Sequence, residues 1–138
     1  MPNRNTLPAG LFFLACAGQA VAWTADLQRG VDLYQVSENG VSLTLVCDPK
    51  GVYGGDETAL SIAVGGDGQL TGTVVITFIG GPKVELALDH GRIAKRDLDP
   101  AVWATLFGGL SSERSLSVLW NGQPHVVETG ELPGFSCT

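Results

Sequence analysis

Apolar and polar residues alternate along most of the chain after residue 30, and glycine-rich turns interrupt the alternation. A period of two is typical of β-strands that bury one face. In 41–47, for example, every second residue from Val41 to Cys47 is apolar and points to one side. Asn-Gly pairs at 39–40 and 121–122 fit tight hairpin turns, because both residues tolerate positive φ. The pattern predicts strands over 31–36, 41–47, 59–64, 70–79, 84–89, 116–120 and 123–128.

A helical period occurs once. Asp99 supplies an N-cap acceptor, and Pro100 suits the first helical position. Apolar residues then recur at helical spacing over 103–110, and we expect the Gly-Gly pair at 108–109 to end the helix.

Together these elements predict an all-β domain. We expect a small β-sandwich or partly open barrel of about seven antiparallel strands with one short helix. Trp103, Phe107 and Trp120 fall on predicted inward faces and are expected in the core. Phe135 and Cys137 are expected to dock the C-terminal tail.

The first 22 residues have the parts of a secretory signal. Arg4 lies in a short polar start, an apolar run follows at 11–17, and Ala20 and Ala22 supply the small side chains that signal peptidase requires. We therefore expect residues 1–22 to be cleaved, leaving a single β-rich domain over 23–138 in the periplasm or outside the cell. The apolar run falls short of the roughly 20 residues of a membrane-spanning helix. The alternative is a lipoprotein acylated at Cys16, although the residues before Cys16 lack the aliphatic-then-small pattern of such sites.

Removal of the signal leaves two cysteines, Cys47 and Cys137. Export would bring them into an oxidising compartment, so we expect them to form a disulfide. A bridge that closes a loop of about 90 residues stabilises by about 4 kcal/mol in the chain-entropy view. Two unpaired buried thiols are the alternative.

The net charge of the chain limits the classes of molecule that it is expected to bind. The chain has a net charge of −6, and without Arg4 seven basic residues face 14 acidic ones, which gives −7. An acidic surface repels phosphate backbones and anionic lipid, so nucleic acid is not an expected partner. The same field permits a cationic protein partner.

Motifs for nucleophilic catalysis, zinc, phosphate or thiol redox chemistry are missing from the sequence, and we expect neither a cofactor nor a metal. His90 in a predicted turn and His125 in the last strand are interpreted as surface residues. Neighbours on an extended chain point to opposite faces, so we do not expect Asp89 to orient His90. Asp97 and Asp99 are interpreted as helix-capping groups rather than as an acid/base pair.

Two Gly/Asp-rich stretches, 48–57 and 65–68, have the composition of calcium loops but not the spacing of an EF-hand, and we interpret them as strand turns. The first also holds Tyr53 among glycines, followed by Asp56 and Glu57. Aromatic residues concentrate binding energy at interfaces. Tyr53, Asp56 and Glu57 are therefore our candidate partner contacts.

The C-terminal half resembles the invasion-associated locus B family of exported bacterial proteins. The residues that carry this resemblance are 84–89 before the helix, the Leu-Ser-Val-Leu-Trp strand at 116–120 and the ending at 132–135. The chain departs from the family in lacking a second, central cysteine pair and in ending with Ser136-Cys137-Thr138. The resemblance implies a periplasmic β-sandwich and says little about activity, because function does not follow from fold.

The sequence thus favours an exported, non-enzymatic binding or accessory module that meets another protein through its loops. An acidic inhibitor of a cationic cell-wall hydrolase such as a lysozyme is the first alternative. An uncharacterised hydrolase is the second.

Overall fold

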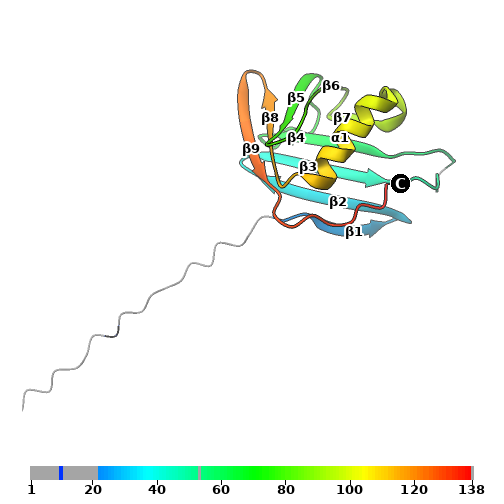
Figure 1. Ribbon diagram of the computed structural model, residues 1–138. Coiled ribbons are helices and arrows are strands. Elements are labelled where there is room, and N and C mark those ends of the chain that lie inside the picture. The colour runs from blue at the N-terminus through cyan, green and yellow to red at the C-terminus, as the bar shows by residue number, and fades with distance from the viewer. Residues whose placement is uncertain (1–9, 11–21, 53, 138) are drawn as a thin grey trace, which may run out of the picture.

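The computed structural model describes residues 10, 22–52 and 54–137. Apart from Gly10 and Ala22, the predicted signal segment lies outside the described residues. Within them the chain forms nine strands, one 3₁₀ turn and one α-helix (Figure 1). In chain order these are β1 (Thr24–Gln28), β2 (Val31–Glu38), β3 (Val41–Cys47), β4 (Ala59–Val64), β5 (Gly72–Phe78), β6 (Lys83–Leu88), β7 (Arg92–Ala94), η1 (Lys95–Asp97), α1 (Pro100–Ser112), β8 (Ser115–Trp120) and β9 (Gln123–Glu128).

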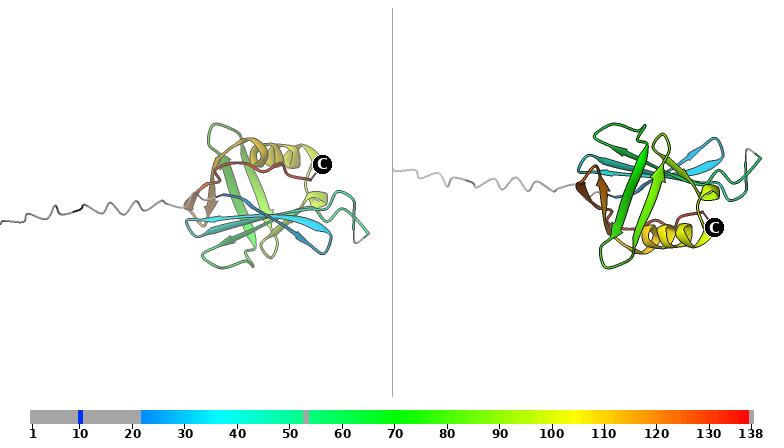
Figure 2. Two further views of the ribbon diagram at one scale, coloured as in Figure 1. Left: turned by 90° about the horizontal axis from the view of Figure 1, so that it is seen from below. Right: turned by 90° about the horizontal axis from the view of Figure 1, so that it is seen from above.

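The strands form two antiparallel sheets that pack as a β-sandwich. The first sheet has the order β1-β2-β3-β4-β7, and the second has the order β6-β5-β8-β9. Strands of the two sheets cross at a steep angle, and α1 lies beside the second sheet on the same face of the first (Figure 2). The sandwich expected from the alternation is confirmed.

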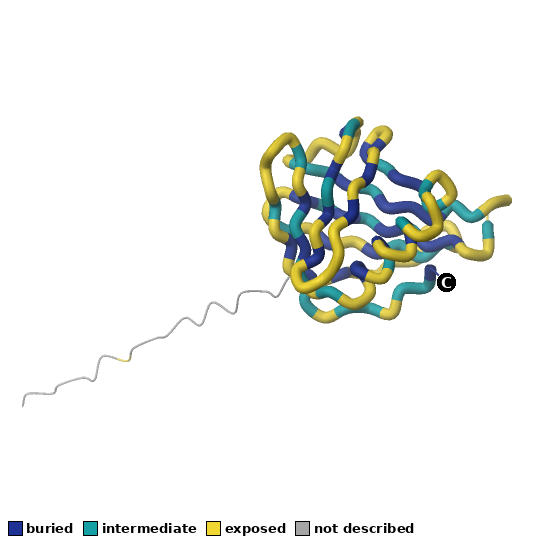
Figure 3. Tube along the Cα trace, turned by 45° about the horizontal axis from the view of Figure 1, so that its top comes forward, coloured by how far each residue is buried: buried dark blue, intermediate teal, exposed yellow. Residues whose placement is uncertain are grey.

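The core lies between the sheets and is built by the inward residues of each strand. Leu43, Leu45 and Ile62 of the first sheet and Ile76 and Val118 of the second are almost completely buried. Buried and exposed residues alternate along the strands, as Figure 3 shows. Burial of this apolar surface is the main stabilising contribution to the fold.

Two strands were not expected from the sequence, which predicted about seven. In β1 all five residues are exposed, so no apolar alternation marks it, and it is held by its register with β2. Strand β7 has three residues and pairs with β4 through Ala94, Ile93 and Arg92. Both strands lie at the edges of the first sheet.

Helix α1 begins as predicted but ends later. The Asp99 carboxylate accepts a hydrogen bond from the Ala101 N–H (2.8 Å), and Pro100 occupies the first turn. The prediction that Gly108 and Gly109 end the helix is wrong, because α1 continues to Ser112. Gly109 lies against the ring of Phe78 in β5, where a side chain would collide. The glycine therefore allows close packing of the helix on the sheet.

The C-terminal tail is fixed at two points. Cys47 of β3 and Cys137 form a disulfide with a Cα–Cα distance of 4.5 Å, as predicted. The Phe135 ring packs edge-on against Trp23 (5.2 Å between ring centroids) and Tyr34 (4.9 Å). The tail thereby ties Trp23, β2 and β3 to the last residues of the domain.

Of the three aromatic residues expected in the core, only Trp103 is buried. Phe107 stacks on Trp103, and both Phe107 and Trp120 are partly buried against the core. The Trp120 ring lies over Gly72 of β5, 3.3 Å from where a Cβ would stand.

The turn between β2 and β3 bridges the two sheets. The Asn39 side chain donates to the carbonyl oxygen of Val126 (2.7 Å), and the Glu128 N–H donates to the carboxylate of Glu38 (2.6 Å). The corner of the first sheet is thus clamped on β9, the edge strand of the second. In the described part of the chain, no helix is long and apolar enough to cross a membrane.

Candidate functional site

The loop that joins β3 to β4 is anchored at both ends. The Asp48 N–H donates to the buried Thr58 hydroxyl (3.0 Å), and the carboxylate of Asp48 accepts from the Val52 N–H (2.9 Å). Close to β4, the Asp56 carboxylate accepts from the Thr58 N–H (2.9 Å). Short polar side chains that bond the backbone in this way hold turns in one conformation. The positions of Asp56 and Glu57 are therefore set by the loop.

Asp56 forms an ion pair with Lys95 of η1, with 3.2 Å between Nζ and Oδ2. Burial alone would raise the pKa of Asp56. Hydrogen bonds from Thr58 and the ammonium group of Lys95 outweigh that effect, so the pKa of Asp56 lies below its ordinary value. The carboxylate is thus kept ionised by groups of the domain itself.

Glu57 pairs with two arginines. Its Oε1 lies 2.9 Å from Nη1 of Arg96, and its Oε2 lies 3.6 Å from Nη2 of Arg92. The same nitrogen of Arg92 also donates to the backbone carbonyl of Glu57 (3.3 Å). The acidic charge of the loop is therefore compensated locally by residues of β7 and η1.

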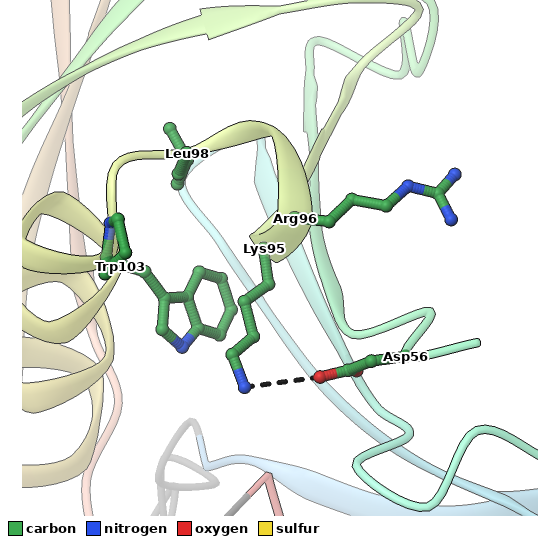
Figure 4. A pocket seen from close by; sticks show the side chains of 6 residues that line it. Asp56, Lys95, Arg96, Leu98 and Trp103 are labelled. Carbon is green, nitrogen blue, oxygen red and sulfur yellow. Dashed lines mark hydrogen bonds and ion pairs between the residues drawn. The ribbon is translucent and has the colours of Figure 1, made fainter.

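A pocket of about 320 Å³ lies between this loop, η1 and the start of α1. We call it the Trp103 pocket; it is lined by Asp56, Lys95, Arg96, Leu98, Pro100 and Trp103. Figure 4 shows Lys95 lying beside the indole of Trp103 and reaching Asp56, while Arg96 extends away from the indole. An apolar wall with a charged rim is the usual composition of a binding pocket, although this volume is at the lower end of the range. The pocket has the size to take one large apolar side chain.

The structure brings together two of the three predicted contact residues, Asp56 and Glu57, and Tyr53 lies outside the described residues. The basic partners and the apolar wall of the Trp103 pocket were not foreseen. Glu57 and Arg96 are 39 positions apart, so nothing local links them. The adjacent Lys95 and Arg96, just before a helix start, were the one available signal.

The two histidines lie in different parts of the sandwich, His90 in the turn between β6 and β7 and His125 in β9. His90 occupies an exposed turn with a φ of 48°, and its Nε2 lies 3.6 Å from Oδ1 of Asp89. The expectation that Asp89 would point away from His90 is wrong, because a positive φ removes the alternation of an extended chain. His125 of β9 contacts the Asn39 carbonyl through Nδ1 (3.1 Å), which must carry the proton because a carbonyl only accepts.

The aspartates of the two glycine-rich stretches act within turns. Asp67 accepts from the Gln69 N–H (2.9 Å), as Asp48 and Asp56 accept from Val52 and Thr58. Asp99 caps α1 as predicted. Among the described residues, no group of three or more His, Cys, Asp or Glu side chains is placed to hold a metal ion.

Comparison with known proteins finds no family model, no curated protein and no solved structure that matches this chain.

Proposed function

We propose that this protein is an exported, non-enzymatic binding or accessory module that contacts another protein through the Trp103 pocket and the adjoining loop at 54–58. The observation that carries the proposal is the pocket itself. Leu98, Pro100 and Trp103 form an apolar wall beside the Lys95–Asp56 pair. Such a site suits an apolar side chain of a partner whose neighbouring polar groups meet the charged rim.

Export to the periplasm or beyond the cell is part of the proposal. The signal-like residues 1–22 support it, as does the resemblance to the invasion-associated locus B family. The disulfide between Cys47 and Cys137 is compatible with an oxidising compartment.

The bonds that hold the two ends of the loop support binding rather than a mobile catalytic lid. Ion pairs of Asp56 and Glu57 connect the loop to β7 and η1, and hydrogen bonds of Asp48 fix its start. A contact surface held in one conformation loses little conformational entropy on association.

Affinity capture from a periplasmic extract, with the disulfide-bonded 23–138 chain as bait, tests the proposal. Arg96→Glu changes the rim of the pocket, and Arg114→Glu makes the same change of charge at an exposed site elsewhere. We expect Arg96→Glu and Leu98→Ser to reduce capture of a specific protein by about tenfold, equivalent to about 1.4 kcal/mol, and Arg114→Glu to leave it unchanged. Equal capture by all variants would show that the Trp103 pocket is not part of the binding surface.

An acidic inhibitor of a cationic hydrolase remains the second candidate, favoured by the net charge of −7 after residue 22. In that case Asp56 and Glu57 would have to exchange Lys95, Arg92 and Arg96 for groups of the enzyme. An assay of a lysozyme with the 23–138 chain at about micromolar concentration separates the two candidates, because only the inhibitor reduces turnover. For the hydrolase alternative, His90→Ala and His125→Ala test whether any detected activity needs a histidine.

A further inference from the structure

The outer face of the first sheet is polar at one end and apolar at the other. Across β2 and β3, Ser37 faces Ser42 and Gln35 faces Thr44, and the two serine hydroxyls lie 2.7 Å apart. Two residues further along the same face, Leu33 of β2 pairs with Val46 of β3. The solvent-facing side of an antiparallel sheet is ordinarily polar. The half-buried aliphatic side chains at this end therefore need another explanation.

These aliphatic side chains form the floor of a concavity of about 340 Å³. We call it the outer trough; it is lined by Arg29, Val31, Leu33, Val46, Glu57 and Arg92, with Gln28 at its margin. The strand order β1-β2-β3-β4-β7 places Arg29 and Arg92 on opposite sides of the aliphatic floor. The trough thus combines an apolar base with a guanidinium group on either side.

Basic side chains are concentrated at the outer trough and the Trp103 pocket, in contrast to the acidic domain as a whole. The outer trough and the Trp103 pocket, which Glu57 links through its ion pairs with Arg92 and Arg96, are lined by Arg29, Arg92, Lys95 and Arg96 against Asp56 and Glu57. Asp26 of β1 adds a third carboxylate, because it pairs with Leu33 on this face and accepts a hydrogen bond from Gln28. Four of the seven basic residues after residue 22 therefore line these two concavities, in a chain segment with a net charge of −7. The local field therefore favours an acidic ligand here over the rest of the acidic domain.

Arg92 is suited to receive a carboxylate. Both of its contacts with Glu57 described above use Nη2, whereas a guanidinium has five N–H donors in a planar fork. Its side chain is 40% exposed. Glu57 itself shows that a carboxylate fits between Arg92 and Arg96.

From these observations we propose that the outer trough binds an extended segment of a partner protein that carries aliphatic side chains flanked by acidic residues. The aliphatic side chains lie on Val31, Leu33 and Val46, and a carboxylate pairs with Arg92 in competition with Glu57. This inference rests on the proposed function, and it adds the chemistry of the partner. Glu57 joins the two surfaces, since it contacts Arg92 at the trough and Arg96 at the Trp103 pocket.

Fluorescence anisotropy with defined peptides tests the inference. The probe is an N-terminally labelled, C-terminally amidated peptide of sequence Gly-Glu-Val-Leu-Val-Glu. Matched peptides carry Lys in place of Glu, or Ser in place of the aliphatic residues. We expect the acidic aliphatic peptide to bind at least about tenfold more tightly than either. Its affinity should fall with added salt.

Variants of the domain locate the binding and separate it from a structural effect. Arg92→Gln and Leu33→Thr should each weaken binding by about fivefold, whereas Glu57→Gln should strengthen it because a competing carboxylate is removed. Gln35→Ser, on the polar part of the same face, and Arg114→Gln are the controls that should change nothing. General loosening of the domain cannot give opposite signs for Arg92→Gln and Glu57→Gln, which share one ion pair.

Three results would overturn the inference: no binding of the acidic peptide at about 1 mM, equal binding of the lysine peptide, or indifference to Arg92→Gln and Leu33→Thr. The proposed function would survive any of them if Arg96→Glu still reduced capture from the extract. Conversely, the peptide could bind in the trough while Arg96→Glu leaves capture from the extract unchanged. That result would contradict only the role of the Trp103 pocket.

Discussion

Gly109 of α1 lies directly on the ring of Phe78 in β5, so that a Cβ at position 109 would stand 2.2 Å from the ring carbon Cε2. Real side chains do not approach so closely, and both Gly109 and Phe78 are buried. The close approach explains why a residue of low helix propensity lies inside this helix.

Gly109→Ala is accordingly expected to destabilise the domain by about 1–3 kcal/mol, because the extra methyl group forces α1 away from β5. Gly108 is the matched control: it is exposed, and no atom lies within 4 Å of the place where its Cβ would stand. Gly108→Ala should stabilise by up to about 1 kcal/mol through helix propensity. Urea unfolding of the two variants measures both changes, and an equal effect of the two substitutions would contradict the packing argument.

The disulfide gives a second prediction. Cys47 and Cys137 are separated by 90 positions, and both are almost completely buried. Replacing both by serine should lower the free energy of unfolding by about 2–5 kcal/mol. In the unaltered protein the bridge should resist dithiothreitol until denaturant is added, as alkylation and mass measurement would show. Rapid reduction under native conditions would mean that the tail opens readily.

Asp56 gives a dependence on pH. Folding lowers the pKa of Asp56, so its carboxylate stabilises the domain at pH values above the ordinary pKa of 3.8. This contribution is lost as the pH falls through the pKa of the folded state. The side chain is 34% exposed, so solvent screening limits the effect to less than about 1 kcal/mol. Asp56→Asn should therefore be less stable than the unaltered protein near neutral pH but not at about pH 2.

Asp67→Asn is the control for this prediction. Asp67 accepts a backbone hydrogen bond from the residue two positions later, as Asp56 does, and an asparagine oxygen can replace that acceptor in either turn. Thermal unfolding across the pH range compares the two variants. A similar pH dependence of both variants would show that the ion pair between Asp56 and Lys95 contributes nothing to the free energy of unfolding.

Export predicts the covalent form of the native protein. Material secreted by its own cell should begin at Trp23 and should take up no thiol-alkylating group without prior reduction. Intact-mass measurement tests both points. A species that still carries Met1, or one that binds two alkylating groups, would contradict the signal or the oxidised state respectively.

The sandwich and its disulfide could be predicted because they follow from local or countable features. Alternation marks each long strand, and two cysteines after residue 22 leave one pairing. Strand β1 could not be found in this way, since Thr24–Gln28 buries no side chain and depends on pairing with β2. The predicted end of α1 was wrong because the Phe78 ring leaves no room for a side chain at position 109, so the glycine is needed inside the helix. Sequence spacing does not reveal this contact between two elements.

The candidate site was predicted only in part, for the same reason. Asp56 and Glu57 were identified from the composition of their loop, but their cations come from β7 and η1, more than 30 positions away. In the sequence alone, the two carboxylates have the pattern of a free acidic patch. In the folded domain, each of them is paired with basic side chains of β7 or η1.

The turn at Asn39 affects whether β9 can pair with a strand of another copy of the protein at high concentration. Val126 and Glu128 belong to the terminal strand of the second sheet, and their main-chain groups would otherwise offer a template for a neighbouring molecule's strand. Asn39 and Glu38 occupy these groups with side-chain partners. The Val126 carbonyl and the Glu128 N–H are thereby unavailable to a strand of another molecule, and the β2–β3 hairpin hinders strand pairing at this part of the edge.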